Sequence, residues 1–415
     1  MERLSDILRE RGYVYQHSSE TLEEITDGPK RTVYLGVDPT ADSMHVGQLQ
    51  GVLVLRRFIE DGHKVIIIIG GGTGMVGDPG GKSAERNLMD DETINENAEA
   101  LRKQFSQLFG GAEFTMVNNA EWLRKLNLMD FLRDVGKHFT VNEMVKRDSV
   151  RPRLETPDAS ISYTEFSYML LQAYDYLELH HRYGCDLQVG GSDQWGNIIS
   201  GVELIRKKTG HTAYAFSWPL LVDKSTGKKF GKSEGGTIWL DAKKTLISDL
   251  YQFWLRAEDN AVEELLLKMT LLTRDQIATI MNEHDQDPSK RHAQRVLARA
   301  VTELVHSKDG VHLAEEVKDT LFVKVAEDIT MSDVAILEQS GLIHKVEVVT
   351  TLLDALVTAE LATSRREARQ FLAEGAVSLN GEKVADRVLE ASDFKKGKAL
   401  LKRGKRSVSV LLLKQ

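Results

Sequence analysis

Residues 33–69 restrict the fold of this chain more than any other stretch, because they combine two apolar runs with one helical pattern. The run V-Y-L-G-V at 33–37 is rich in β-branched residues and ends at Asp38-Pro39, which predicts a buried strand followed by a break. The run V-I-I-I-I at 65–69 is apolar throughout, as in strands covered on both faces of a parallel sheet. Between them a helix is expected to run to about Asp61, with Gly62 as its stop. Strand, helix and strand form one parallel crossover unit, so the chain is predicted to be an α/β protein.

The turn after the first strand is predicted to bind an anion. Asp42 or Ser43 can cap the helix, and His45 and Gly47 then fall in its first turn. A helix N-terminus at the carboxyl end of a strand attracts negative charge through its free N–H groups and its dipole. An imidazole there can reach a phosphate, and a glycine lets a flat ring lie on the backbone. The His-x-Gly triplet is a weak signal alone, and the surrounding strand, turn and cap give it weight.

Size and composition limit the classes of protein that need to be considered. A chain of 415 residues predicts two or three domains. Its single cysteine, Cys185, excludes a disulfide framework and a cysteine-based zinc site, and favours a reducing compartment. No apolar segment is long enough for a signal core or a membrane span, so we expect a cytoplasmic protein. The net charge of −8 argues against indiscriminate nucleic-acid binding, although local basic patches remain compatible with it.

The glycine-rich stretch after the second strand contains two incomplete nucleotide motifs. G-T-G-M-V-G at 72–77 matches a dinucleotide fingerprint, but D-P-G-G at 78–81 is hostile to the helix that this fingerprint requires. The G-K-S that follows lacks the first glycine of a P-loop, because that position is Val76. The remaining interpretation is a flexible loop whose tip, with Lys82 and Arg86, closes on an anion. The alternative is a solvated surface loop.

A helical, charged segment at about 92–158 is interpreted as an insertion between two halves of a split sheet. A helix is then predicted to start near Tyr163. Tyr168, Gln172 and Asp175 lie at spacings of four and three residues, so they share one face of that helix. A polar stripe on a mostly apolar helix must meet water, a partner helix or a ligand. The alternative is a polar seam that neighbouring backbone satisfies.

Residues 186–201 repeat the opening pattern of strand, glycine turn, acidic residue and helix. Gln188, Gly191, Asp193 and Gln194 would therefore face the same crevice as the turn at His45, which is a topological switch point. A last strand is predicted at 218–222.

Four lysines and four glycines occupy the loop 223–236 that follows the last strand. Glycines allow such a loop to move, and lysine acts on phosphates as a flexible point charge. We therefore expect a mobile cationic arm. The alternative is an exposed basic surface loop.

The last third of the chain is predicted to contain two further modules. Residues 241–330 have a helical pattern, and 331–349 is interpreted as a linker. In 350–415 we expect two short helices, the second capped by Ser364, and a hairpin with Asn380-Gly381 as its turn. Basic residues collect in this module of an otherwise acidic chain, which favours nucleic-acid binding. They include Arg365, Arg366, Arg369, Lys395, Lys396, Lys398, Lys402, Arg403, Lys405, Arg406 and Lys414.

Taken together, these motifs resemble those of the bacterial tyrosyl-tRNA synthetases, a family of class I aminoacyl-tRNA synthetases. D-P-T-A-D-S-M-H-V-G at 38–47 is similar to the family's H-I-G-H signature, and K-F-G-K-S at 229–233 to its K-M-S-K-S signature. G-G-S-D-Q-W-G-N at 190–197 and E-F-S-Y-M-L-L-Q-A-Y-D at 165–175 are similar to the tyrosine branch specifically. The resemblance implies a Rossmann-like parallel-sheet catalytic domain at 1–240, an α-helical anticodon-binding domain at 241–330 and a small α+β RNA-binding domain at 350–415.

The resemblance also implies roles for particular residues. Tyr34 and Asp175 would bind the phenol of tyrosine, and Tyr168, Gln172 and Asp78 its ammonium group. Gln188 and Gln194 would line the same pocket. The residues implied to cradle ATP are Gly36, Asp38, Thr40, His45, Gly47, Gln48, Gly191 and Asp193, and those implied to clamp its phosphates are Lys82, Arg86, Lys229, Lys232 and Ser233. Two positions depart from the family pattern: Gln48 replaces a common histidine and Leu35 a common cysteine.

The implied reaction is that of a tyrosine–tRNA ligase. The tyrosine carboxylate would attack the α-phosphate of ATP, releasing pyrophosphate and forming tyrosyl-adenylate, and tyrosine would then be transferred to the 3′ end of tRNA(Tyr). Because the attacking group is already an anion, the first step needs positioning and charge stabilisation but no general base. ATP is then a substrate that arrives with Mg²⁺, without a tightly bound metal. A homodimer without a membrane partner is also implied.

Three alternatives remain open from the sequence. A class I synthetase for another amino acid, above all tryptophan, would share the signatures but not the polar triad and the basic tail. An RNA-binding relative that has lost catalysis would share the fold, although His45, Lys229 and Lys232 are retained. A nicotinamide-dependent dehydrogenase is the third.

Overall fold

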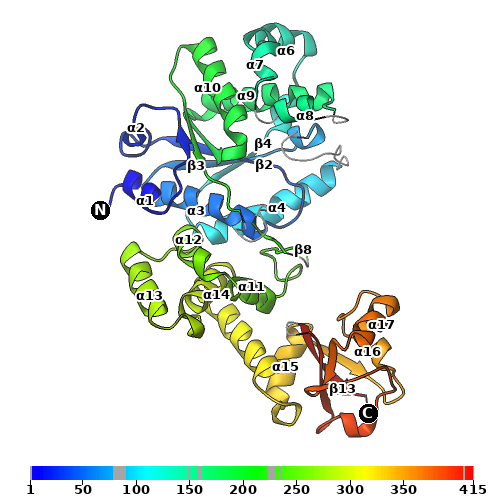
Figure 1. Cartoon of the computed structure of the whole chain (residues 1–415). Coiled ribbons are helices and arrows are strands. Elements are labelled where there is room, and N and C mark those ends of the chain that lie inside the picture. The colour runs from blue at the N-terminus through cyan, green and yellow to red at the C-terminus, as the bar shows by residue number, and fades with distance from the viewer. Residues whose placement is uncertain are drawn as a thin grey trace. The chain divides into compact units, whose positions relative to one another are not determined.

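The computed structural model describes residues 2–77, 90–147, 150–156, 160–222, 230–233, 236–404 and 407–414. Two compact units are present. The first contains 1–244 and 257–300, and the second contains 245–256 and 301–415 (Figure 1). Among the described residues, none of the helices combines the length and the apolar composition needed to cross a bilayer.

A six-stranded sheet forms the centre of the first unit. Its order is β1-β6-β5-β2-β3-β4, and all neighbours are parallel except β1 and β6. The strands are β1 (Gln16–His17), β2 (Thr32–Val37), β3 (Lys64–Ile69), β4 (Thr115–Asn118), β5 (Leu187–Gly191) and β6 (Tyr214–Trp218). Five of the six residues of β3 are buried. The predicted parallel α/β fold is therefore confirmed.

Helices cover both faces of this sheet (Figure 1). They include α1 (Leu4–Glu10), α2 (Leu22–Thr26), α3 (Val46–Glu60), α4 (Asp91–Leu108), α9 (Tyr163–Tyr183) and α10 (Trp195–Thr209). On the face of α9 and α10, a core cluster contains Tyr34 of β2, Ile66 and Ile68 of β3, and Tyr176 of α9. Ser162 caps α9 by accepting a hydrogen bond from the N–H of Glu165, which confirms the predicted helix start.

Two sequence predictions for this sheet need correction. The segment 92–158 is not wholly helical, because residues 115–118 pair with β3 as the edge strand β4. Short helices then follow: α5 (Ala120–Leu123), α6 (Leu128–Asp134), α7 (Val141–Met144) and α8 (Arg151–Glu155). The last strand of the sheet lies at 214–218 rather than 218–222, since Pro219 has no N–H with which to continue a ladder.

The helices after residue 244 are divided between the two units. In the first unit are α12 (Asp259–Met269), α13 (Arg274–Gln286) and the start of α14 (His292–Phe322). Arg11 joins this part to the sheet domain, because its buried guanidinium donates to the carbonyls of Leu267 at 2.7 Å and Thr270 at 2.9 Å. These are carbonyls at the end of α12, which the helix leaves without internal donors. The predicted helical segment 241–330 therefore contributes helices to both units.

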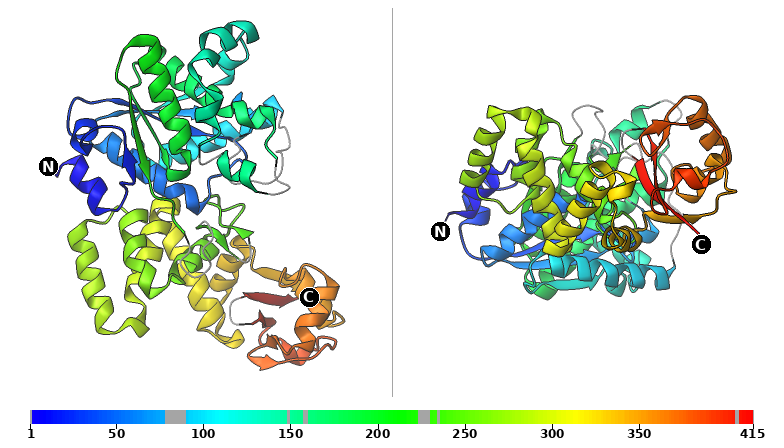
Figure 2. Two further views of the ribbon diagram at one scale, coloured as in Figure 1. Left: turned by 45° about the horizontal axis from the view of Figure 1, so that its top comes forward. Right: turned by 90° about the horizontal axis from the view of Figure 1, so that it is seen from below.

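The second unit contains a five-stranded sheet, ordered β11-β10-β12-β13-β9. Its strands are β9 (Ile343–Val346), β10 (Val377–Leu379), β11 (Glu382–Lys383), β12 (Lys398–Arg403) and β13 (Ser407–Leu413), and its helices include α11 (Ile247–Leu255), α15 (Met331–Gln339), α16 (Leu352–Thr358) and α17 (Arg365–Ala373). The sheet lies beside α16 and α17 (Figure 2). Ser364 caps α17, and Asn380 and Gly381 have positive φ values of 51° and 93°, which confirms the predicted helix cap and hairpin turn.

Residues 331–349 are not a linker. They contain α15 and β9, and β9 pairs in parallel with β13. Val334 and Leu337 of α15 share a core cluster with Leu400 and Val410 of the sheet. The small C-terminal module therefore starts well before residue 350, because its sheet needs β9 as an edge strand and α15 as part of its cover.

Candidate active site

The predicted site lies where the strand order of the first sheet reverses. From β2 the chain crosses to β3 on one side, and from β5 it crosses to β6 on the other. Tyr34 and Gln188 are direct register partners in the pairing of β2 with β5. Crevices at the carboxyl ends of strands at such a reversal are the usual ligand sites of open parallel sheets. The two halves of the sequence pattern are thus brought to one place.

His45 caps α3, in place of the predicted Asp42 or Ser43. Its Nδ1 accepts a hydrogen bond of 3.1 Å from the N–H of Gly47, and its own N–H donates to Oε1 of Gln48 at 3.0 Å. This is a reciprocal capping arrangement in which an imidazole takes the place of the usual hydroxyl. Sequence rules favour Ser and Asp as caps, so they led to the wrong residue.

The cap also determines the tautomer of His45. Because Nδ1 accepts a hydrogen bond, the neutral ring must hold its proton on Nε2. Nε2–H is then a donor at the N-terminus of α3, where the helix dipole already favours an anion. The geometry therefore supports the predicted contact between His45 and a phosphate.

Two buried polar atoms at the reversal have no hydrogen-bond partner among the residues that the structure describes. They are the hydroxyl of Tyr34, whose residue is 1% exposed, and Oε1 of Gln188, whose residue is 2% exposed. Tyr34 packs edge-on against Tyr176 with 5.0 Å between ring centroids. Leaving a buried polar group unpaired destabilises the fold by about 1–3 kcal/mol. Such atoms at a strand reversal point to a polar ligand that completes their hydrogen bonds.

Asp175 is buried close to Tyr34 and is 3% exposed; burial, and after it the charge of Asp175, raises the pKa of the Tyr34 phenol. Its Oδ2 accepts a hydrogen bond of 2.8 Å from Asn119, and its Oδ1 accepts one of 2.7 Å from the indole N–H of Trp122. Burial raises the pKa of Asp175 to about 7, and these two N–H donors oppose the rise by favouring the carboxylate. The side chain is thus held rigidly by both oxygens.

Asn119 and Trp122 are residues of the candidate site that the sequence did not suggest. Asn119 is fully buried; it also donates to the hydroxyl of Thr73 at 2.9 Å and accepts from the N–H of Gly72 at 2.7 Å. It therefore joins the glycine-rich turn after β3 to Asp175. The one available signal was its position directly after β4, which the sequence pattern did not identify as a strand.

The other predicted residues that the structure describes are distributed around this cluster. Tyr168, on the same helix as Asp175, is buried, and Gln172 is half-buried. Gln194 is half-buried, with its Oε1 accepting from Asn197 at 3.3 Å, while Asp193 is exposed. The residues predicted to cradle ATP at the end of β2 are partly or fully exposed: Gly36, Asp38 and Thr40. Gly191 is buried at the end of β5.

Part of the predicted phosphate clamp lies outside the described residues. This applies to Lys82, Arg86 and Lys229, and to the side chains of Lys232 and Ser233. Asp78, predicted to hold the ammonium group of tyrosine, also lies outside the described residues. The described edge of the lysine loop does lie against α3. A Cβ added to Gly47 would stand 2.9 Å from the carbonyl oxygen of Phe230, and one added to Gly231 would stand 3.1 Å from the N–H nitrogen of Gly47. The close approach explains why both positions are glycine.

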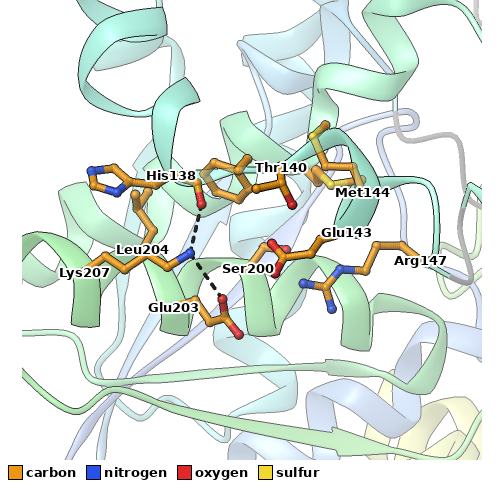
Figure 3. Close-up of a pocket in the computed structure, with 11 residues that line it drawn as sticks. His138, Thr140, Glu143, Met144, Arg147, Ser200, Glu203, Leu204 and Lys207 are labelled. Atoms are coloured by element: carbon orange, nitrogen blue, oxygen red, sulfur yellow. Dashed lines mark hydrogen bonds and ion pairs between the residues drawn. The ribbon is translucent and has the colours of Figure 1, made fainter.

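A small cavity elsewhere in the first unit contains none of the predicted site residues (Figure 3). It is bounded by α7, α9, α10 and neighbouring turns, and its volume of about 10 Å³ suits a single water molecule. Lys207 closes one side, since its Nζ donates to the carbonyl of His138 at 2.9 Å and lies 3.6 Å from Glu203. We assign no substrate to this cavity.

Comparison with known proteins points to one family. Residues 26–323 match the family model for class I tRNA synthetases (W and Y), and 340–411 match the model for the SYY-like C-terminal domain of tyrosine–tRNA ligases. The chain is 45% identical to a tyrosine–tRNA ligase of Chromobacterium violaceum over 96% of each chain. It is 43% identical to tyrosine–tRNA ligase 1 of Vibrio parahaemolyticus over 91% of each chain.

Solved structures give the same result. The chain is similar to a C-terminally truncated mitochondrial tyrosyl-tRNA synthetase of Aspergillus nidulans, with a TM-score of 0.68 and 32% identity. That match covers 78% of this chain and 95% of the other. A tryptophanyl-tRNA synthetase of Encephalitozoon cuniculi shares the fold, with a TM-score of 0.54 and 14% identity.

The raised pKa of Asp175 predicts a specific dependence of stability on pH. Since the folded protein binds this proton more tightly than the unfolded chain does, Asp175 should lower the free energy of unfolding as the pH rises from about 4 to about 7. The decrease should be roughly 1.4 kcal/mol per pH unit, with no further change above that range. Because the asparagine side chain of Asp175→Asn does not titrate, this variant should lack this decrease in the free energy of unfolding. Urea unfolding of both proteins between about pH 4.5 and pH 8 measures the difference; parallel curves would show that Asp175 has an ordinary pKa.

Proposed function

The chain belongs to the tyrosine–tRNA ligases within the class I tRNA synthetases, and from this membership we propose how its residues act. It is an enzyme that uses ATP to join tyrosine to tRNA. The observation that carries the assignment of the amino-acid site is the buried polar cluster of Tyr34, Gln188 and Asp175 at the strand reversal. A phenol is the group that would complete it.

We propose that the hydroxyl of tyrosine donates to Asp175 and accepts from the hydroxyl of Tyr34. Each carboxylate oxygen of Asp175 already accepts one N–H, and a carboxylate oxygen can accept a second hydrogen bond. Phenylalanine would leave the buried Tyr34 hydroxyl unsatisfied and would give Asp175 no further hydrogen bond, which is unfavourable. This difference would select tyrosine. Tyr168, Gln172 and Asp78 are proposed to hold the ammonium group, and Gln194 to line the pocket beside Gln188.

The ATP site is proposed to lie at the N-terminus of α3. There the amino acid's carboxylate would attack the α-phosphate in line, so that pyrophosphate leaves and tyrosyl-adenylate remains. Nε2–H of His45 and the hydroxyl of Thr40 would stabilise the charge that grows on the phosphate oxygens. Gly36, Asp38, Gly47, Gln48, Gly191 and Asp193 are proposed to hold the rest of the nucleotide. Since Oε1 of Gln48 is occupied by the His45 N–H, its amide nitrogen is the end that would donate to ATP.

Lys82, Arg86, Lys229, Lys232 and Ser233 stay proposals for the phosphate clamp on the grounds of sequence alone. Magnesium is proposed to arrive bound to the phosphates of ATP, because Mg²⁺ commonly takes its ligands from substrate phosphates and one or two carboxylates. Among the residues that the structure describes, no group of three or more His, Cys, Asp or Glu side chains is arranged to hold a metal ion. The predicted cytoplasmic location also stays a prediction.

The basic face of the second unit is proposed to bind tRNA(Tyr), and the helices at 241–330 to contact its anticodon arm. The side chains of Arg365, Arg366 and Arg369 are all exposed on α17. Exposed arginines on one short helix suit a phosphate backbone, because they can pair with it at little desolvation cost. The match of 340–411 to a C-terminal domain of tyrosine–tRNA ligases supports this proposal.

A homodimer through the inserted helices is proposed as the assembly. Several large apolar side chains are exposed on α6, α7 and α8, which is unusual for a surface that faces only water. The exposed fractions are 67% for Leu128, 72% for Met129, 62% for Val141 and 53% for Leu154. A second copy of the chain would cover them.

ATP–pyrophosphate exchange in the presence of tyrosine, phenylalanine or tryptophan tests the amino-acid site. We expect exchange with tyrosine, and we expect Asp175→Ala to narrow the ratio of tyrosine to phenylalanine activity by at least about tenfold, since a charged hydrogen bond is lost. Exchange with tryptophan as the preferred amino acid would overturn the specificity. An unchanged ratio in Asp175→Ala would move phenol recognition to another residue.

Charge reversal on α17 tests the tRNA site. Replacing Arg365, Arg366 and Arg369 by Glu should leave tyrosine-dependent exchange intact and weaken tRNA charging, with a shallower dependence of tRNA affinity on salt. The matched control replaces the same three residues by Lys, which keeps the charge and should retain most charging. Equal charging by both variants would remove α17 from the interface. This design avoids deleting 350–415, which would strip β9 of its partner β13.

Sedimentation equilibrium tests the assembly. Met129→Asp combined with Val141→Asp should convert a dimer to a monomer, because two charges would be buried at the contact. Val349→Asp is a control at a valine that is 72% exposed in the second unit, and it should leave the mass unchanged. A wild-type chain that sediments as a monomer at all concentrations would contradict the proposal.

A further inference from the structure

The segment 238–240 runs antiparallel to the segment 44–46 that ends at the first residue of α3. His45 and Trp239 are bridge partners, and backbone hydrogen bonds of 3.0 and 2.8 Å lie on either side of them. The backbone of His45 is therefore held from one side by α3 and from the other by this returning segment. Neither the sequence motifs nor the family resemblance predicts a role for the segment 238–240.

The side chains in this region form a closed series of contacts. The ring of Trp239 meets the ring of His45 edge-on, with 6.1 Å between centroids and 77° between planes. Nζ of Lys244 lies 5.2 Å from the centroid of the Trp239 ring. The same Nζ pairs with Oδ1 of Asp42 at 2.6 Å. Asp42 stands three residues before His45, so the series returns to the turn from which it started.

Each contact restricts the next. Attraction between an ammonium and an indole face is weak where both groups are partly exposed. A partly exposed ion pair adds a similar small amount at most. The two contacts are therefore too weak to stabilise the fold appreciably, yet together they limit the orientations of the indole. The half-buried Trp239 in turn limits how far the imidazole can rotate while it keeps its hydrogen bond from Gly47.

We propose that Trp239 is a positioning residue for His45, held in place by Lys244 and Asp42. Its indole keeps the imidazole ring in the orientation in which Nε2–H faces the triphosphate of ATP. The inference rests on the proposed function in one respect, which is that His45 acts on ATP. It adds a residue that contacts no substrate itself and works only through His45. Misplacing a catalytic group by about 1 Å can lower the reaction rate about 100-fold. An imidazole that is free to rotate should therefore be detectable as a slower rate of adenylate formation.

A double-mutant cycle in the full chain tests the proposal, with the rate of adenylate formation as the readout. Trp239→Ala should lower the rate between about 10- and 100-fold, with tyrosine affinity changed less than about twofold. Trp239→Phe keeps an aromatic edge and should recover most of the rate. In a His45→Ala background, Trp239→Ala should have no further effect, because the group that it positions is gone.

Two further variants keep the test decisive. Lys244→Met should lower the rate of adenylate formation less than Trp239→Ala does, and this effect should also disappear in the His45→Ala background. It replaces Trp239→Ala in the cycle if that variant does not fold. Lys30→Met breaks a comparable, partly exposed pair with Asp61 and should leave the rate unchanged.

The possible failures are distinguishable. If His45→Ala leaves adenylate formation intact, the proposed role of His45 falls, and this inference with it. If His45→Ala is slow but Trp239→Ala is equally harmful with and without His45, only the inference is overturned, since Trp239 would then act on the fold. Full activity of Trp239→Ala would overturn it as well.

Discussion

The short parallel pairing of β2 with β5 is the constraint on which the site depends. Two register pairs, Val33 with Leu187 and Tyr34 with Gln188, join the two halves of the sheet. From this pairing the strand order continues to β3 and β4 on one side and to β6 and β1 on the other. The connections that follow β2 and β5 therefore diverge, and a crevice forms between them at the carboxyl ends of the two strands. A slip of one residue would turn Tyr34 to the other face of the sheet, and its hydroxyl would leave the cluster with Asp175. The chemistry of the pocket is therefore a consequence of sheet register.

Asp175 is a carboxyl group in a buried environment that disfavours its charged form, and hydrogen bonds hold it in place there. Burial favours its protonated form and raises its pKa to about 7, so the isolated protein gains nothing from an ionised carboxylate there. Asn119 and Trp122 hold the side chain in one orientation, and Asn119 extends the network to the glycine turn after β3. The ligand proposed for this site would offset that cost in stability by completing the hydrogen bonds of the cluster. Preorganisation of this kind is typical of binding sites that must discriminate on one hydroxyl.

Sequence reasoning succeeded where the signal was local. The buried β3 run, the helix with Tyr168, Gln172 and Asp175 on one face, and the Asn380-Gly381 turn depend on periodicity or on one residue's backbone preference. It failed where a distant partner decided the outcome. The local pattern around β4 predicts helix, because four residues do not reveal their pairing with β3. The pattern at 331–349 predicts a linker, because β9 becomes a strand only when it pairs with β13.

The sequence alone determined the class of fold, the family resemblance and most of the residues assigned to the site, because hydrophobic periodicity and short motifs are written in neighbouring positions. Only the tertiary structure decided that His45 itself caps α3 and so holds its proton on Nε2, that Asn119 and Trp122 hold Asp175, and that Trp239 lies against His45. These relations join residues from about 50 to almost 200 positions apart or replace a favoured cap by a rarer one. Contacts at that separation depend on how strands and helices pack, and no local pattern encodes them.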